Sequence, residues 1–220
     1  MKKIPEPTID RLSIYLRCLS TLEKEGVETI SSQELAARFN LHSAQIRKDL
    51  AQFGEFGVRG TGYHVKRLRS CIERILGLDV PRNIGVIGAG NLGRAIADYE
   101  GFLETNFTVA ALFDNDPAKI GLKTKLGVQI YDVTDLKQVI KDKSLDIIVL
   151  ALPATVAQQV LDQVVEAGIK AVLSFAPTQL NVPEDVKLKV VDLTVSLDTL
   201  SQSLVAHRLE ENLLVTDLDP

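Results

Sequence analysis

The sequence is poor in cysteine and histidine and has no long apolar run. Cys18 and Cys71 are its only cysteines among 220 residues, too few for a disulfide framework and typical of a protein in a reducing cytosol. No stretch reaches the roughly 18 consecutive apolar residues of a membrane-spanning helix, and residues 1–7 lack the apolar run of a secretory signal. We therefore expect a soluble cytoplasmic protein whose cysteines are core residues rather than a redox pair.

Charge is unevenly distributed along a chain that has enough apolar material for a core. Hydrophobic residues make up 45% and charged residues 25% of the chain, close to the averages of globular proteins, which excludes wholesale disorder. Residues 1–82 carry a net charge of +4 and residues 83–220 a net charge of −8. A basic module beside an acidic remainder is typical of a polyanion-binding domain attached to a second domain, although a chance fluctuation gives the same pattern.

The first 76 residues have the pattern of a winged helix-turn-helix. Apolar residues recur every three or four positions from Thr8, the expected helix cap, to Glu25, and Ser31 forms a capping box with Glu34 for a second helix. Ser43 is expected to cap the third helix, which glycines separate from a hairpin. In order, the expected elements are helices over 8–25, 33–39 and 43–53, a hairpin over 58–65 and a helix over 66–76.

The third of these helices is the candidate for reading DNA, because in a winged helix-turn-helix it enters the major groove with its first residues toward the base edges. Glutamine pairs bidentately with adenine, and arginine or lysine pairs with guanine. The candidate reading residues are Ser43, Ala44, Gln45, Arg47 and Lys48. Arg59 at the hairpin is expected to reach a minor groove or a phosphate, and basic residues over 66–69 would add backbone contacts. The alternative is that this basic face is solvated or docks on the acidic domain.

Beyond residue 82 the pattern changes to strands that alternate with helices. This alternation implies βαβ units and a doubly wound parallel sheet covered on both faces, an α/β domain of the Rossmann type. The expected strands are 83–87, 108–113, 146–152 and 171–175, and the expected helices are 91–104 and 154–167. We therefore expect a winged-helix domain over residues 1–80, a Rossmann-type domain over 81–192, and a C-terminal helix and tail over 193–220.

A glycine-rich turn joins the first of these strands to its helix. The turn is Gly88-Ala89-Gly90-Asn91-Leu92-Gly93, and Asp114 ends the next strand 21 residues after Gly93. In the dinucleotide-binding fingerprint the first glycine allows the tight turn, the second the approach of the pyrophosphate, and the third close packing of helix on strand. A carboxylate at Asp114 would hold the ribose hydroxyls of an adenosine and repel a 2′-phosphate, which favours NAD(H) over NADP(H). FAD and coenzyme A use similar turns, and a turn that binds nothing is the remaining alternative.

The expected nucleotide domain lacks the acid–base group of a dehydrogenase. Of the three histidines, His42 and His64 lie in the first domain and His207 lies near the C-terminus. No cluster of histidine, cysteine and aspartate has the spacing of a metal site. Two functions remain open, a DNA-binding regulator that senses NADH and NAD+, and an NAD-dependent oxidoreductase with a helical appendage. The missing acid–base group and the basic third helix favour the regulator, which is not an enzyme.

Several stretches, in one order along the chain, match a known family. In the first domain they include residues 9–17, 44–50, 53–57 and 60–63, and in the second 88–93, 99–102, 113–117, 167–170 and 175–177. Over residues 4–205 the sequence resembles the Rex family, the redox-sensing transcriptional repressors of bacteria. Ser174 departs from the family pattern, in which asparagine precedes Phe-Ala-Pro, and the tail after Leu209 matches nothing in it.

The resemblance implies a homodimer that represses genes of anaerobic or fermentative metabolism and releases its operator DNA when NADH accumulates. A dimer implies an inverted-repeat operator with half-sites about one helical turn, or a multiple, apart. Within the hairpin stretch that matches the family, Gly60 and Tyr63 are expected to join Arg59 at the DNA.

The resemblance also implies which residues couple the redox site to DNA. Tyr99 and the loop Phe175-Ala176-Pro177 are expected near the nicotinamide, and Arg17 of one subunit is expected to pair with Asp192 of the other. Oxidised nicotinamide carries a positive charge, so an apolar pocket would favour NADH on physical grounds alone.

The C-terminal helix carries a heptad-like apolar stripe. Leu193, Leu197, Leu200 and Leu204 recur at intervals of four and three residues. Either this helix packs on its own sheet, or it crosses to a partner subunit and forms the dimer.

Overall fold

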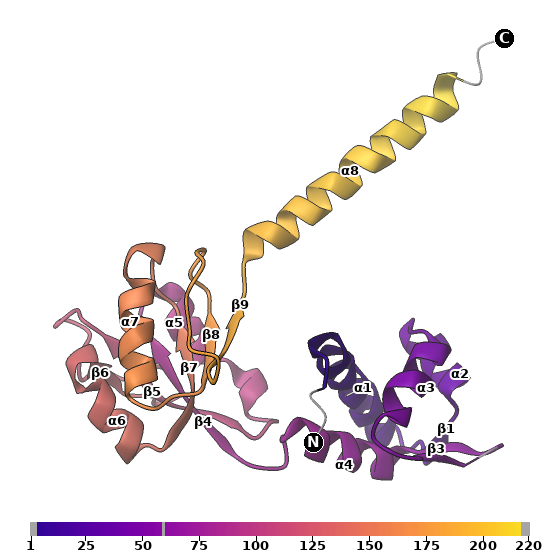
Figure 1. Ribbon diagram of the computed structural model, residues 1–220, viewed down its shortest axis with the longest axis horizontal. Helices are drawn as coiled ribbons and strands as arrows, with labels where there is room; N and C mark the ends of the chain where they lie inside the picture. Colours follow the sequence, from indigo (N-terminus) through magenta and orange to yellow (C-terminus); the bar gives the residue numbers. More distant parts are fainter. Residues whose placement is uncertain (1–3, 59, 217–220) are drawn as a thin grey trace. The chain divides into compact units, whose positions relative to one another are not determined.

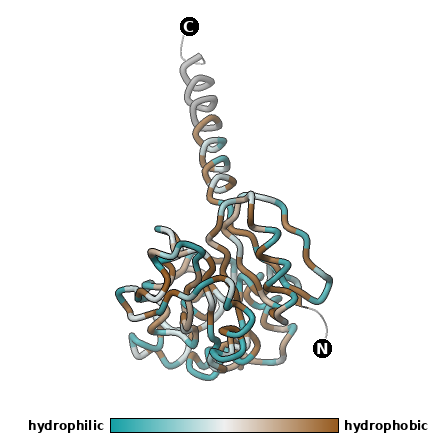
Figure 2. The backbone as a smooth tube through the Cα atoms, turned by 90° about the vertical axis from the view of Figure 1, so that its left-hand side faces the viewer, coloured by the Kyte–Doolittle hydropathy of each residue, from teal (hydrophilic) through white to brown (hydrophobic). Residues whose placement is uncertain are grey.

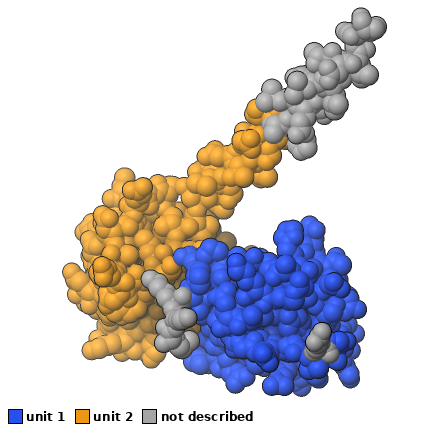
Figure 3. Space-filling view, turned by 45° about the vertical axis from the view of Figure 1, so that its right-hand side comes forward, with its two compact units in different colours: residues 1–81 blue, residues 82–220 orange. Residues whose placement is uncertain are grey.

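The computed structural model describes residues 4–58 and 60–216, with side chains described as far as residue 205. The chain forms two compact units, residues 1–81 and residues 82–220 (Figure 3). The first unit thus ends one residue beyond the domain boundary expected after residue 80. None of the described helices is both long enough and apolar enough to cross a membrane.

In the residues that the structure describes, the first unit combines four helices with a small antiparallel sheet of order β1-β3-β2 (Figure 1). The hairpin predicted over 58–65 is present as β2 and β3. The strand β1, which pairs with β3, has two residues and is too short for a periodic signal in the sequence. In chain order the elements are α1 (Glu6–Lys24), β1 (Thr29–Ile30), α2 (Ser32–Phe39), α3 (Ser43–Ala51), β2 (Gly57–Val58), β3 (Gly62–His64) and α4 (Val65–Leu76).

Only one of the three predicted helix caps is present. Ser31 caps α2, since its hydroxyl accepts a hydrogen bond from the Glu34 N–H at 3.1 Å while the Glu34 carboxylate accepts one from the Ser31 N–H at 2.8 Å. The prediction that Thr8 caps α1 is wrong, because the helix already begins beyond Pro5 and buries Thr8 in its first turns. The prediction for Ser43 is also wrong, since Ser43 is the first helical residue of α3 and His42 holds the cap position.

The second unit is built on six parallel strands in the order β6-β5-β4-β7-β8-β9. The sheet is parallel and doubly wound, as predicted, and the structure adds the strand order, with the switch point between β4 and β7. The sequence pattern did not indicate β6, α6 or β9, which are short or expose charged residues at the sheet edge. The elements are β4 (Arg82–Ile87), α5 (Asn91–Ala97), β5 (Phe107–Asp114), β6 (Ile130–Asp132), α6 (Leu136–Asp142), β7 (Leu145–Leu150), α7 (Ala154–Glu166), β8 (Ala171–Ser174) and β9 (Lys187–Val190).

Helices cover both faces of this sheet because alternate strand residues point to opposite sides. Ile84 and Val86 of β4 belong to the buried cluster that contains Ala97 of α5. Ile87 of the same strand belongs to the cluster of the other face, which contains Leu136 of α6 and residues of α7. The carboxyl ends of β4, β5 and β7 therefore form one edge, where open α/β sheets bind their ligands.

The helix α5 is shorter than predicted. The sequence pattern predicts a helix over 91–104, whereas α5 ends at Ala97 and a separate 3-10 turn spans Glu100–Phe102. Asp98 at the break accepts hydrogen bonds from the N–H groups of Lys125, at 3.2 Å, and Leu126, at 2.8 Å. These bonds to a distant loop hold the chain at the point where the helix stops.

The helix α8 (Leu193–Thr216) follows β9 as one continuous helix (Figure 1). Figure 2 shows hydrophobic positions recurring along its described part. The four predicted stripe leucines, at 193, 197, 200 and 204, are each more than 60% exposed. The described part of α8 therefore does not pack on its own sheet, which was one of the two alternatives.

Candidate nucleotide and nucleic-acid sites

In the turn between β4 and α5, contacts with the protein's own backbone require glycine at two of the three motif positions. Gly88 has a positive φ of 103°, and a Cβ there would lie 2.3 Å from the Ala151 carbonyl oxygen. A Cβ on Gly93 would lie 1.8 Å from the carbonyl oxygen of Gly88. A Cβ on Gly90 would meet no atom within 4 Å. The protein itself leaves this position open, as a site for close ligand approach would require.

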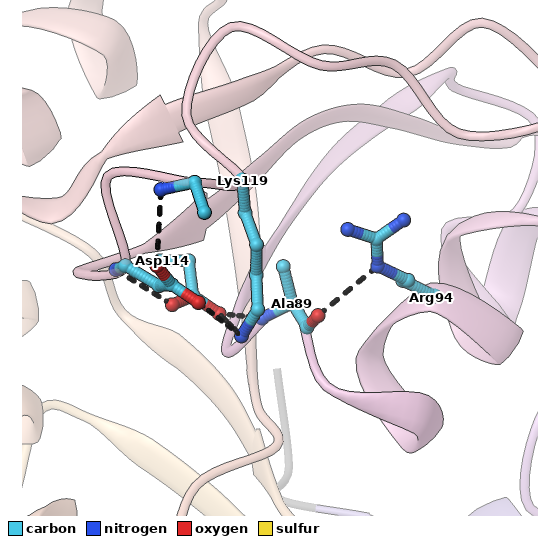
Figure 4. Close-up of polar contacts among 6 residues, drawn as sticks. Ala89, Arg94, Asp114 and Lys119 are labelled. Carbon is cyan, nitrogen blue, oxygen red and sulfur yellow. Dashed lines mark hydrogen bonds and ion pairs between the residues drawn. The ribbon is translucent and has the colours of Figure 1, made fainter.

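Hydrogen bonds to neighbouring strands fix the turn. The Gly88 N–H donates to the Phe113 carbonyl oxygen at 2.8 Å, and the Ala89 N–H donates to Oδ2 of Asp114 at 2.8 Å. On its other side, the Ala89 carbonyl accepts a bond from Nε of Arg94 at 3.1 Å (Figure 4). The turn is thus tied to the end of β5, and Asp114 lies beside it as the motif predicts.

Asp114 is a buried carboxylate with three hydrogen-bond donors around it (Figure 4). Besides Ala89, the Asp116 N–H donates to Oδ1 at 2.9 Å and Nζ of Lys119 donates to Oδ2 at 3.1 Å. Burial alone raises the pKa of Asp114, but the bonds from Asp116, Lys119 and Ala89 outweigh it and hold the pKa below the ordinary value. Asp114 is therefore ionised at neutral pH, and a carboxylate accepts about four hydrogen bonds, which leaves room for a further donor.

The residues predicted near a nicotinamide follow α5 and β8. Tyr99 is 59% exposed, and its ring meets that of Phe102 edge-on with centroids 5.2 Å apart. In the loop after β8, Phe175 is half-buried against the α5 face of the sheet, Ala176 is buried and Pro177 is exposed. Ser174, the residue that departs from the family pattern, is buried, and its hydroxyl accepts a bond from the Ala176 N–H at 3.2 Å. This bond fixes the start of the apolar loop.

The two predicted coupling residues lie in different units. Arg17 is exposed on α1 in the first unit. Asp192 immediately precedes α8, and its carboxylate accepts bonds from the N–H of Thr194 at 2.8 Å and from its hydroxyl at 2.6 Å. These bonds lower the pKa of Asp192, so the carboxylate is charged at neutral pH.

The exposed face of α3 carries three of the five predicted reading residues. Ala44, Arg47 and Lys48 are exposed, whereas Ser43 and Gln45 are half-buried. The amide of Gln45 donates to Oδ1 of Asp49, one helical turn further on, at 2.8 Å.

The hairpin residues predicted to contact DNA differ from one another in exposure. Gly60 is exposed, whereas Tyr63 is 9% exposed and belongs to the core of the first unit. Because its ring packs in this core, burial does not favour the expected contact of Tyr63 with DNA, which stays a prediction. Arg59 lies outside the described residues.

Two sets of contacts at these candidate sites have little or no signal in the sequence. Lys119 pairs with Asp114, and the only signal in the sequence is a lysine five residues after the strand-end aspartate. Arg11 and Tyr15 of α1 hydrogen-bond to Asp49 of α3. Nothing local in the sequence indicates this contact, because Asp49 lies more than 30 residues from both partners.

The sequence is 52% identical over 199 residues to the redox-sensing transcriptional repressor Rex of Syntrophomonas wolfei subsp. wolfei, which covers 90% of this chain and 94% of that one. The chain belongs to the Rex family. A second Rex repressor, from Carboxydothermus hydrogenoformans, is 47% identical over 90% of this chain and 95% of its own length. These relatives are named as transcriptional repressors and not as enzymes, which confirms the regulator over the oxidoreductase.

Family models and solved structures agree with membership of the Rex family. Residues 3–51 match the family described as "Putative DNA-binding protein N-terminus", and residues 79–178 match the "CoA binding domain". The crystal structure of RSP in complex with beta-NAD+ and operator DNA has a TM-score of 0.90 at 41% identity and covers 97% of this chain and 98% of that chain. The structure of RSP in complex with beta-NADH has a TM-score of 0.85 at 39% identity, with coverage of 97% and 100%. This Rex-family protein is a redox-sensing transcriptional repressor.

Proposed function

We propose that the second unit binds NADH and NAD+ at the turn 88–93 and that NADH releases the protein from operator DNA. The observation that carries this proposal is the buried Asp114 carboxylate bonded to the Ala89 N–H at 2.8 Å. This contact brings the acceptor for the ribose hydroxyls within a hydrogen bond of the turn that approaches the pyrophosphate. Gly90, whose Cβ would meet nothing in the protein, supports the same placement.

The chemistry at Asp114 favours NAD(H) over coenzyme A and NADP(H). Coenzyme A carries a 3′-phosphate and NADP(H) a 2′-phosphate on the adenosine ribose, and an ionised carboxylate repels both. Two free ribose hydroxyls instead suit Asp114 as acceptor and Lys119, 3.1 Å away, as donor. The similarity to RSP, whose structures contain beta-NAD+ and beta-NADH, supports the same cofactor for this chain.

The redox preference follows from the loop after β8. In the proposed complex, Tyr99 and the Phe175-Ala176-Pro177 loop line the nicotinamide pocket. Loss of the positive charge on reduction then favours NADH, because this apolar loop offers no counter-charge. Each tenfold preference needs only about 1.4 kcal/mol. The preference affects DNA only when NADH binds better to the domain arrangement that does not fit the operator.

The first unit is the proposed DNA-binding domain, with α3 in the major groove. Arg47 and Lys48 on its exposed face would contact guanine edges or phosphates, with Ala44 close to the bases and Ser43 at the start of the helix. Gly60, which is exposed, and Arg59, as the sequence predicts, would contact a minor groove or the backbone. A repressor of this kind acts in the bacterial cytoplasm, where the chromosome is.

The protein is proposed to act as a homodimer through α8. The exposed leucines at 193, 197, 200 and 204 form an apolar stripe whose contact with water is unfavourable. A second copy of the helix would cover this stripe. Arg17 of one subunit and the charged Asp192 of the other are proposed to pair, which would link α1 of the DNA-binding domain to the start of α8. A two-fold symmetric protein matches an inverted-repeat operator.

Release of selected DNA by NADH tests the proposed function. Fragments of bacterial genomic DNA retained by the full-length protein are labelled, and their affinity is measured with NADH or NAD+ added. We expect a few inverted-repeat fragments to be retained and then released by NADH but not by NAD+. Asp114→Asn should need about tenfold more NADH for release, since a charge-assisted bond to the ribose is weakened. Asp185→Asn, which changes an exposed carboxylate in the same unit, should behave as the wild type.

Retention of DNA that responds to neither NADH nor NAD+ would contradict the proposal.

The dimer is tested separately with Leu200→Glu on the stripe and Gln202→Glu, two residues along, as the control. Leu200→Glu should yield monomers in sedimentation velocity and lose operator affinity, and an unchanged dimer would refute the role of α8. A chain truncated after Asp192 should likewise be a monomer that binds DNA poorly.

A further inference from the structure

A single buried carboxylate joins the proposed recognition helix α3 to α1. Asp49 is fully buried and accepts four hydrogen bonds. Nε of Arg11 donates to Oδ2 at 2.6 Å and Nη2 of Arg11 donates to Oδ1 at 2.8 Å. The Tyr15 hydroxyl donates to Oδ2 at 3.0 Å and Nε2 of Gln45 donates to Oδ1 at 2.8 Å. Four bonds saturate a carboxylate, so no acceptor position of Asp49 remains for another partner.

This arrangement fixes orientation as well as distance. A guanidinium that meets a carboxylate through two parallel bonds defines the plane of both groups, so Arg11 sets how α3 lies against α1. Burial of the Tyr15 ring and its bond to Asp49 raise the pKa of the phenol to about 12. Burial raises the pKa of Asp49, but its bonds to Arg11, Gln45 and Tyr15 hold the pKa below the ordinary value. The donors and the acceptor therefore keep their protonation states through the neutral range.

The same carboxylate determines how the Gln45 amide is turned. An ionised carboxylate only accepts, so the nitrogen of Gln45 must face Asp49 and its oxygen must face away. Bidentate reading of adenine requires the oxygen and the nitrogen of the amide to align together with one base edge. Gln45 is half-buried at the border of the exposed face of α3, whereas Arg47 and Lys48 lie on that face.

We propose that Gln45 is a positioning residue and not a base-reading residue, and that Arg11, Tyr15, Gln45 and Asp49 form a clamp that sets how the exposed face of α3 meets DNA. This inference rests on the proposed function, in which α3 enters the major groove. If it is correct, the exposed residues of α3 contact the bases directly. The sequence specificity of the protein then depends partly on α1, which carries two of the four clamp residues.

The test compares the sequence preference of variants of the full-length protein. The wild type and Gln45→Leu each select from a pool of randomised double-stranded DNA, and the affinities for the selected duplex, for its single base-pair variants and for an unselected duplex are measured. We expect Gln45→Leu to select the same sequence and to bind it about tenfold more weakly, with the order of the single base-pair variants unchanged. Lys48→Ala, the matched change on the exposed face, should instead alter the preference at a base pair or lower the salt dependence of binding.

A conservative variant separates clamping from a general loss of structure. Gln45→Lys keeps a donor one turn from Asp49 but has no acceptor for the adenine amino group. It should select the wild-type sequence and restore the ratio of selected to unselected affinity to within about threefold of the wild type. Tyr15→Phe combined with Gln45→Leu should weaken operator binding by less than the product of the single effects, because both residues act through one carboxylate. All variants are measured where circular dichroism shows them folded, and their NADH affinity should be unchanged.

The outcomes distinguish this inference from the function on which it rests. If Gln45→Leu loses preference at one base pair and keeps the others, Gln45 reads a base and the inference is wrong. Unchanged operator affinity in Gln45→Leu, or failure of Gln45→Lys to restore it, would also overturn the clamp. If the wild type itself selects no sequence, the proposed function fails and the clamp fails with it.

Discussion

Gly90 and Gly93 lie three residues apart in one turn, and their replacement by alanine is expected to separate ligand binding from folding. A Cβ on Gly93 would lie 1.8 Å from the Gly88 carbonyl oxygen, where ordinary contact begins at 3.4 Å, so that carbonyl must move by about 1.6 Å. Overpacking of this kind costs about 1–3 kcal/mol. The unfolding transition of the second unit should therefore fall by about 3–10 °C in Gly93→Ala without any ligand.

Gly90→Ala is the contrasting variant. Gly90 has φ −77° and ψ −169°, which alanine adopts freely, and its Cβ would meet nothing within 4 Å. Alanine is a poorer helix cap than glycine, which lowers the unfolding free energy by up to about 1 kcal/mol. Alanine also reduces the entropy of the unfolded chain, which raises the unfolding free energy by about 0.4–1 kcal/mol. The melting temperature without ligand should thus stay within about 3 °C of the wild type. The new methyl group would keep the pyrophosphate away from the backbone N–H groups. NADH would then lose one or two charge-assisted hydrogen bonds, each worth about 1.5–3 kcal/mol of binding free energy.

Scanning calorimetry with and without NADH measures both effects on the full-length chain. At a concentration of about one hundred times its Kd, NADH adds about 2.7 kcal/mol to the wild-type unfolding free energy, or roughly 5–10 °C. Gly90→Ala should lose most of this increase while keeping its ligand-free transition. A full NADH shift in Gly90→Ala would refute the placement of the pyrophosphate, and an unchanged ligand-free transition in Gly93→Ala would refute the packing argument.

Four further predictions concern the first unit. Asp49→Ala leaves Arg11, whose side chain is only one-third exposed, without its partner and should cost about 2–4 kcal/mol in urea unfolding. The pKa of Asp49 in the folded protein lies below its ordinary value of 3.8. The stability that ionised Asp49 contributes is therefore complete above pH 3.8 and is lost as the pH falls through the folded pKa. Asp49→Asn should lack this pH-dependent part of the unfolding free energy. Burial raises the pKa of Cys18, whereas Cys71 is half-exposed, so a thiol reagent should modify Cys71 first in the folded protein and both cysteines at equal rates in urea. Ser31→Ala removes the α2 cap and should cost about 1 kcal/mol, with Ser32→Ala, beside the cap position, as the control; equal losses would contradict the capping role.

Features that depend on near neighbours in the sequence were predictable. The glycine turn before α5 and the capping box at Ser31 are local, because each requires particular residue types a few positions apart. The order of helices and strands followed from apolar residues that recur every three or four positions in the helices and from short apolar runs in the strands, which are buried on both faces of the sheet. The Rex resemblance drew on the same local stretches, and the relatives bear it out.

The tertiary structure decided what depends on contacts between distant segments. Tyr63 was expected at the DNA, but pairing of β3 with both β1 and β2 directs its ring inward. Helix α5 was expected to reach residue 104, but it ends at Ala97, beside Asp98, whose carboxylate accepts hydrogen bonds from the N–H groups of Lys125 and Leu126.

The sequence alone therefore predicted a nucleotide turn and a helix-turn-helix, since both motifs consist of consecutive residues. It did not determine the partners of Asp49 or the pairing of Lys119 with Asp114. A buried charge is stabilised by whichever donors the fold brings to it, and those of Asp49 include residues of α1 from more than 30 positions away in the chain.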